Sequence, residues 1–163
     1  MKSNRLKLNC DKTECMWIMS QQRTRTLSVP DLTVGGIVVK PSSGARNLGV
    51  FFDSEMDLKV HISNVCRACF VQLRQLRAVR RSLLSDVLRT LLNAFVSCRL
   101  DYCNLLLVEL PQCDIRRLQS VQNAAARLYG GVSRRDHVTP ILRDDLHWLP
   151  VFQRIQFKIG VLT

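Results

Sequence analysis

Apolar residues recur at helical spacing through the middle of the chain. At 100° per residue, one broad arc of apolar side chains runs from Leu88 to Leu106, and polar residues occupy the other side. Pro111 then interrupts the pattern and, as a first-turn residue, can open a second helix with a narrower apolar stripe from Ile115 to Leu128. Because the break is short, the two helices are expected to lie antiparallel and to share a core.

Arg99 is the exception in the first of these helices. A regular helical period places it among Leu92, Phe95 and Tyr102, inside the apolar arc. An unpaired buried charge costs several kcal/mol, so a partner is needed. The sequence predicts a structural salt bridge from Arg99 to a later acid, with a ligand contact as the alternative. The candidate acids are Asp136, Asp144 and Asp145.

The first fifty residues show strand patterns instead. Leu32–Val34 and Ile37–Val39 flank two glycines, which predicts a tight β-hairpin. Glu14–Met19 and Asn47–Phe52 are short apolar runs that predict two further strands. Such a small antiparallel element is not stable alone. The expected class is therefore α+β, with this β element followed by a mostly helical bundle.

From about Asp57 the period becomes helical, and arginines follow one face. The apolar stripe comprises Ile62, Val65, Cys69, Leu73, Leu76 and Val79. A neighbouring row comprises Arg67, Arg74, Arg77 and Arg81, within about one quadrant of the helix. This row either faces solvent or tracks a phosphate backbone. Ser85 is the predicted N-cap of the next helix.

A second polar row lies on the helix that follows Pro111. Arg116, Ser120, Asn123 and Arg127 share the face opposite its apolar stripe, where they either donate to phosphates or face water. Two glycines after Tyr129 end that helix.

The last thirty residues are expected to fold back on the bundle. Thr139-Pro140 begins a short helix, and Trp148 in the following turn is predicted to anchor on the core. Val151–Thr163 begins another amphipathic helix, whose abrupt end suggests truncation at the C-terminus.

Net charge and composition limit the kinds of partner and the cellular compartment that can be expected. The net charge of +11 over 163 residues favours polyanions such as nucleic acid, and also fits a piece of a larger acidic assembly. The sequence has no secretory leader and no run as long as a membrane span. Seven cysteines, an odd number, are expected to be free thiols. An intracellular protein, nuclear or cytoplasmic, is therefore expected, without a membrane partner and not secreted.

The sequence contains no recognisable set of residues that would make the chain an enzyme by itself. Cys66 and Cys69 form a CxxC, but it lies in a helical pattern without a second ligand pair, so buried thiols are favoured over a zinc site. No metal site is predicted. The sequence has no G-x-S-x-G, P-loop or H-E-x-x-H motif, and its three histidines are far apart.

Several strings in fixed order resemble one region of a known family. They are LKLNCDKTECMWI, RNLGVFFDSEM, RACFVQLRQLRAVRRSL, AFVSCRLDYCNLLL, LQSVQNAAARL and HVTPILRDDLHWLPVFQRIQFKI. Together they resemble the C-terminal part of the reverse transcriptase of LINE-type (non-LTR) retrotransposons of the jockey-like kind. The resemblance runs from about Leu6 to Ile159, which is nearly the whole chain.

The resemblance implies roles for particular residues. Lys12 matches a palm-motif lysine implicated in nucleotide addition, for example as proton donor to the leaving pyrophosphate. Leu48 and Gly49 match the turn of the primer grip, where backbone approaches the primer end and a residue without Cβ is favoured. Residues 1–53 would then be a palm remnant, and residues 54–163 a thumb and the region beyond it. In this family the thumb holds the RNA/DNA template–primer duplex, which would engage the arginine row.

Departures from the family limit what the chain can do alone. The catalytic aspartates that hold Mg²⁺ lie upstream in the family and are absent here, so the fragment is expected to be inactive without the upstream polymerase portion. Family members usually read LRDLHWLP, so Asp144-Asp145 contains an apparent one-residue insertion, and Val108-Glu109 replaces a usual Tyr-Gly. Two alternatives stay open: a non-enzymatic nucleic-acid-binding module derived from such an element, or a decayed copy without function.

Overall fold

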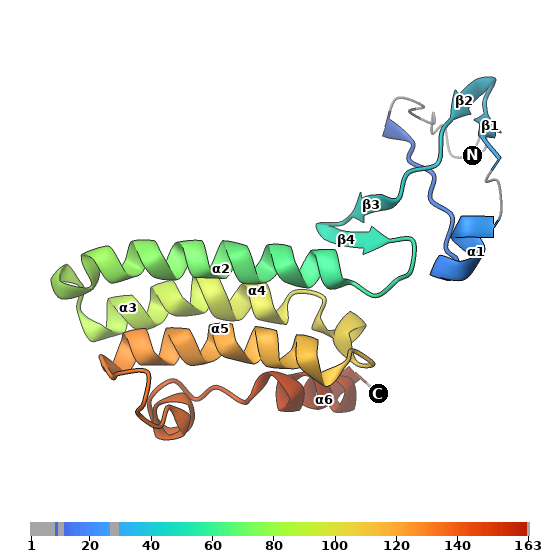
Figure 1. The fold of residues 1–163 in the computed structure, drawn as a ribbon. Coiled ribbons are helices and arrows are strands. Elements are labelled where there is room, and N and C mark those ends of the chain that lie inside the picture. The colour runs from blue at the N-terminus through green and yellow to red at the C-terminus, as the bar shows by residue number, and fades with distance from the viewer. Residues whose placement is uncertain (1–8, 10–11, 27–29, 163) are drawn as a thin grey trace. The chain divides into compact units, whose positions relative to one another are not determined.

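A computed structural model describes residues 9, 12–26 and 30–162. The chain forms two compact units, Met1–His61 and Ile62–Thr163. The first contains two small antiparallel hairpins and the second is helical, which confirms the α+β class (Figure 1). The division falls within the first long helix, whereas the sequence places it at 53/54.

The first hairpin has the predicted form. β1 (Leu32–Val34) pairs antiparallel with β2 (Ile37–Val39), and Val34 lies opposite Ile37. The two glycines between them have φ values of 60° and 85°. Two successive positive φ values match the twist of the flanking strands in a two-residue turn, and glycine adopts them without steric cost. A short helix, α1 (Gln21–Thr26), precedes this hairpin and was not predicted.

The predicted strand Asn47–Phe52, ending at Asp53, is confirmed only from Val50 onward, because the chain reverses inside it. β3 (Gly44–Asn47) pairs antiparallel with β4 (Val50–Asp53), with Asn47 opposite Val50. Leu48 and Gly49 form the turn, with φ values of 46° and 88°. The apolar run continues through the turn, so composition alone did not mark the reversal.

The predicted strand Glu14–Met19 is also wrong. Cys15 makes a single parallel bridge to Pro41. The Ser42 N–H donates to the Cys15 carbonyl at 2.8 Å, and the Met19 N–H donates to the Ser54 carbonyl at 3.0 Å. These isolated bonds place the segment along the base of the β3–β4 hairpin. In the described part of the chain each sheet has two strands, so no larger palm-like sheet is formed there.

The long helices of the helical unit lie side by side as rods (Figure 1). α2 (Lys59–Val79) leads through a 3-10 turn, η3 (Arg80–Ser82), into α3 (Ser85–Leu92). A π-helical turn, η4 (Asn93–Ser97), joins α3 to α4 (Cys98–Asp101). A second 3-10 turn, η5 (Asn104–Leu107), precedes α5 (Gln112–Gly130). As predicted, α5 runs antiparallel to α3–α4 and shares its core.

The core is made by one face of each rod. Its fully buried side chains include Ile62, Cys69, Leu88, Leu92, Val96 and Val121. Pro111 lies just before α5 with extended backbone, and Gly131 ends that helix with φ 65°. Both ends of α5 thus follow the sequence pattern.

The expectation that Arg99 is buried is wrong, and the π turn is the reason. Leu88 and Leu92 are buried as predicted, but beyond them Val96 and Leu100 take the core positions. A π turn holds one more residue than an α turn, so the buried face moves by one position along the sequence. Arg99 therefore faces solvent.

The predicted N-cap of α3 is also wrong. Leu84 is the N-cap residue, with φ −66° and ψ 151°, and Ser85 is already helical. No side chain caps this end, and the Leu88 N–H donates to the Leu84 carbonyl at 2.9 Å.

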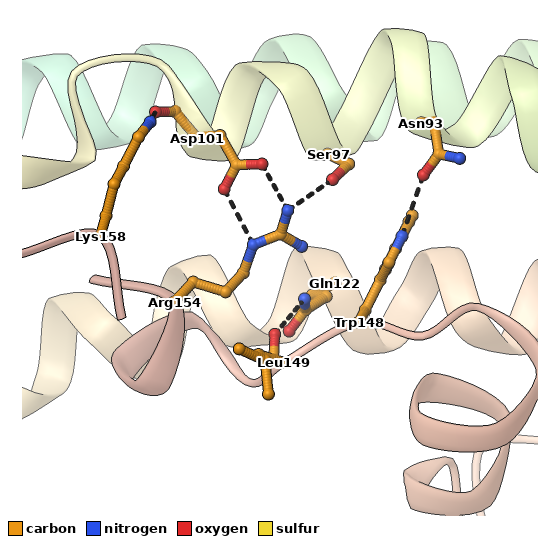
Figure 2. A network of polar contacts seen from close by, with 8 residues as sticks. All are labelled: Asn93, Ser97, Asp101, Gln122, Trp148, Leu149, Arg154 and Lys158. Atoms are coloured by element: carbon orange, nitrogen blue, oxygen red, sulfur yellow. Dashed lines mark hydrogen bonds and ion pairs between the residues drawn. The ribbon is translucent and has the colours of Figure 1, made fainter. Parts of the chain in front are cut away.

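The C-terminal segment folds back on α3–α4 through polar contacts (Figure 2). Trp148 is buried, as predicted, and its indole N–H donates to Asn93 Oδ1 at 2.9 Å. Arg154, on α6 (Val151–Leu162), donates to the carboxylate of Asp101 and to Ser97 Oγ. Asn93, Ser97 and Asp101 lie four residues apart on one face of the π turn and the helix after it, and this face contacts Trp148 and α6.

α5 also makes hydrogen bonds to this segment. Gln122 is fully buried and donates to the Leu149 carbonyl at 2.9 Å, as Figure 2 shows. The Val151 N–H donates to Gln119 Oε1, also at 2.9 Å. These two glutamines therefore fix the turn that carries Trp148. The sequence pattern had not singled them out.

A second π turn includes Asp144-Asp145. η6 (Ile141–Asp145) ends with the Leu146 N–H donating to the Ile141 carbonyl at 3.0 Å, five residues back. One additional residue in a helical turn is accommodated by this wider hydrogen-bonding pattern.

Candidate nucleic-acid interface

The arginine row predicted on the first long helix is exposed throughout. Arg67, Arg74 and Arg77 lie on α2, and Arg81 follows on η3. The sequence contains no Asp or Glu from Leu58 through Ser85. None of the ion pairs found within the described residues uses these four guanidinium groups. We call this surface the arginine stripe.

Unlike the arginines of the stripe, Arg80 makes hydrogen bonds to another helix of the protein. Its Nε donates to the Leu128 carbonyl at 3.2 Å and its Nη2 donates to the Tyr129 carbonyl at 3.1 Å. These carbonyls belong to the last turn of α5, where the C=O groups have no hydrogen-bond donor within the helix. A cation at a helix C-terminus is also favoured by the helix dipole. Arg80 therefore ties the end of α2 to the end of α5.

A hollow of about 260 Å³ lies beside the stripe, between α2 and α5. It is lined by Phe70, Leu73, Arg74 and Arg77 from α2, and by Ala124 and Leu128 from α5. Sequence reasoning missed Phe70. The signal was available, because Phe70 lies three residues after Arg67 and four before Arg74, which is the spacing of one helix face.

The arginines predicted on the second helix differ in accessibility. Arg116 is exposed on α5, whereas Arg127, about three turns later, is half-buried and its Nε has no hydrogen-bond partner. Two other members of that polar row bond within the helix: Ser120 donates to the Arg117 carbonyl, and Asn123 accepts from Gln119. The row is thus only partly open to a ligand.

The predicted catalytic and primer-grip residues lie in the other unit. Lys12 is exposed in a short turn, where its N–H donates to the Asn9 carbonyl at 3.2 Å, and it belongs to neither sheet. Leu48 and Gly49 form the tip of the β3–β4 hairpin, and the Leu48 side chain is 82% exposed. A non-glycine residue at positive φ is strained, so this apolar tip is an unusual feature of the hairpin.

Another hollow, of about 300 Å³, lies by α6 and is lined mainly by polar side chains. These are Asp101, Asn104, His147, Arg154 and Lys158, with Leu149 and Phe157 as apolar neighbours. Arg154 is neutralised by Asp101, and Lys158 donates to the Asp101 carbonyl at 3.0 Å. Most of the charge here is therefore used to hold α6.

Cys66 and Cys69 are buried, as predicted for structural thiols. Burial raises the pKa of the Cys66 thiol, and it raises the pKa of Cys69 to about 11. A metal ligand must be the thiolate, which burial disfavours. Within the residues that the structure describes, no group of three or more His, Cys, Asp or Glu side chains is placed to hold a metal ion.

None of the described helices combines the length and the apolar character that crossing a bilayer requires. A comparison of the chain with protein-family models, with curated proteins and with solved structures found no match. Function is therefore inferred from the residues and their geometry.

Proposed function

We propose that this chain is the C-terminal part of a LINE-type reverse transcriptase, comprising the end of the palm, the primer grip and the thumb. The ordered strings that span the chain support this reading, and so does the turn made by Leu48 and Gly49 at a hairpin tip. The observation that carries the proposal is the arginine stripe, an exposed basic face whose arginines make none of the ion pairs found within the described residues. Such a face suits the RNA/DNA template–primer duplex.

The length of the stripe fits a duplex backbone. From Arg67 to Arg81 a helix rises about 21 Å at 1.5 Å per residue. At about 3.4 Å per phosphate along one strand, that length runs beside roughly six phosphates. Arginine binds phosphate in a bidentate manner and keeps its charge at all physiological pH values. Such contacts would position the duplex without reading its sequence.

The fragment is proposed to hold nucleic acid but not to copy it. Nucleotide addition needs two Mg²⁺ ions aligned by paired carboxylates, and the family's aspartates would come from the upstream polymerase portion. Purified chain incubated with primer–template, nucleotides and Mg²⁺ or Mn²⁺ is expected to show no primer extension. Measurable DNA synthesis would contradict this part of the proposal.

A salt series tests the binding. The chain should bind a blunt RNA–DNA duplex with a log–log salt slope that reflects several phosphate contacts, about 0.9 per contact on B-form duplex. The double variant Arg74→Glu/Arg81→Glu should bind more weakly and with a shallower slope. The matched control is Arg23→Glu/Arg143→Glu, which makes the same charge change at exposed positions outside the stripe. Equal losses for both pairs would mean that net charge, not this face, binds the duplex.

The second candidate is a non-enzymatic nucleic-acid-binding module, favoured by the same stripe. Lys12 separates the two. In a polymerase completed with the upstream portion, Lys12→Ala should slow nucleotide addition and leave template binding nearly unchanged. Equal loss of both would make Lys12 structural, and unchanged addition would favour the module.

A further inference from the structure

Phe70 interrupts the arginine stripe with an aromatic ring. It shares a helix face with Arg67, Arg74 and Arg77, and 42% of its surface is exposed. It also forms one wall of the hollow between α2 and α5. An exposed aromatic side chain among cations is the arrangement by which proteins stack unpaired bases.

We propose that this hollow binds one unpaired nucleotide, whose base stacks on Phe70 while Arg74 and Arg77 hold the adjoining phosphates. The inference rests on the proposed function, because it assumes that the stripe contacts nucleic acid. The inference adds to duplex binding a preference for a junction between duplex and single strand. The apolar part of the lining, made by Leu73, Ala124 and Leu128, suits the face or edge of a base.

Size and charge both favour an unpaired nucleotide over other occupants. A hollow of about 260 Å³ admits a base with its sugar, but it is too small for paired strands. Inside a duplex the base faces are already stacked, so Phe70 can reach only a base that has left the helix. The two arginines at the rim would attract phosphate, whereas an apolar peptide would leave their charges unpaired.

The walls of the hollow are fixed by contacts at both ends of the helix pair. Arg80 binds the last carbonyls of α5, and Arg117 of α5 donates to Ser63 Oγ of α2 at 2.8 Å. A preformed site loses less conformational entropy when its ligand binds.

The test compares three labelled ligands by fluorescence anisotropy: a blunt RNA–DNA duplex, the same duplex with a five-nucleotide single-stranded extension, and that extension with abasic residues. The full chain should bind the extended duplex about tenfold more tightly than the blunt one, as expected for stacking of one base. Phe70→Leu, which keeps an apolar side chain, should remove most of this preference. Phe70→Tyr should restore it, and Phe152→Leu, at a similarly exposed phenylalanine on α6, should leave it unchanged.

The abasic ligand makes the test specific. Abasic residues should weaken wild-type binding to the extended duplex about tenfold, yet have little further effect on Phe70→Leu. If Phe70→Leu weakens blunt and extended duplexes equally, or changes neither, the nucleotide site is overturned while duplex binding stands. If the wild-type chain binds none of the ligands, the proposed function fails and the inference fails with it.

Discussion

Arg154 and Asp101, 53 residues apart in the sequence, form the two-pronged ion pair that holds the last helix on the bundle. Nε of Arg154 lies 2.8 Å from Asp101 Oδ1, and its Nη2 donates to Asp101 Oδ2 and to Ser97 Oγ. The Arg154 side chain is only 18% exposed, so solvent screens this pair less than a surface pair. Hydrogen bonds to both carboxylate oxygens fix the orientation of the partly buried Arg154 guanidinium.

Removal of this guanidinium should loosen the C-terminal segment. Arg154→Met leaves Asp101 and Ser97 without their partner and is expected to lower the free energy of unfolding by about 2 kcal/mol, measured by urea denaturation. The control is Arg143→Met, which breaks an exposed pair with Asp144 and should leave the free energy of unfolding nearly unchanged, because solvent screens that pair. Similar values for the two variants would show that the Arg154 contacts do not stabilise the fold.

Arg80 and Arg81 are neighbours with separable roles. Arg80→Met removes two hydrogen bonds to the end of α5 and should lower the free energy of unfolding by about 1–2 kcal/mol. Arg81→Met changes an exposed side chain and should alter stability by less than about 0.5 kcal/mol. Instead it should reduce the salt slope of duplex binding by about one phosphate contact. Both variants are compared by thermal unfolding and by the binding series. If Arg81 were the structural residue, Arg81→Met would lose more stability than Arg80→Met, and Arg80→Met would have the shallower salt slope.

Deletion of one aspartate from Asp144-Asp145 tests the second π turn. The sequence left by deleting either residue is the same, and it lets η6 return to an α turn. We expect the free energy of unfolding to stay the same or rise by up to about 1 kcal/mol, since a π turn is rarely favoured on its own. Deletion of Ser120 is the comparison, because it rotates half of the α5 face out of the core and should unfold the protein. Strong destabilisation by the aspartate deletion would show that both aspartates are required for the fold.

The buried thiols predict a pH dependence of stability. The pKa of Cys69 is raised to about 11 in the folded chain by burial, against an ordinary value of 9.0. Above pH 9 the thiol ionises more readily in the unfolded chain, so the free energy of unfolding should fall as pH rises from 9 to 11. Cys69→Ala should show a smaller fall over that range. A slope identical to wild type would mean that the fall belongs to other groups.

Much of the helical unit could be predicted from sequence because its helices are amphipathic and clearly punctuated. Pro111 and Gly131 mark the ends of α5, and a 3.6-residue period identifies the buried face of α2. The arginine stripe follows from the same period, since charged residues seldom occupy a packed face. The Gly-Gly hairpin could also be predicted, because glycine pairs strongly favour a two-residue hairpin turn.

Errors arose where one residue changed the register. The π turn at Asn93–Ser97 moved the buried face by one position, so Arg99 faces solvent and Asp101 meets Arg154. No local signal distinguishes a π turn from an α turn in this stretch. Similarly, Leu48 occupies a turn position that composition assigns to a strand, because a leucine at positive φ is rare.

The sequence by itself determined the long helices, the Gly-Gly hairpin, the amphipathic faces outside the π turn and the excess of positive charge, because these depend on composition and on spacing along the chain. Tertiary structure alone decided which polar groups meet: Trp148 with Asn93, Arg154 with Asp101, and Arg80 with the end of α5. It also decided that Phe70 shares a hollow with the stripe and with α5. Such partners lie tens of residues apart, and their pairing depends on how helices pack, which local periodicity does not encode.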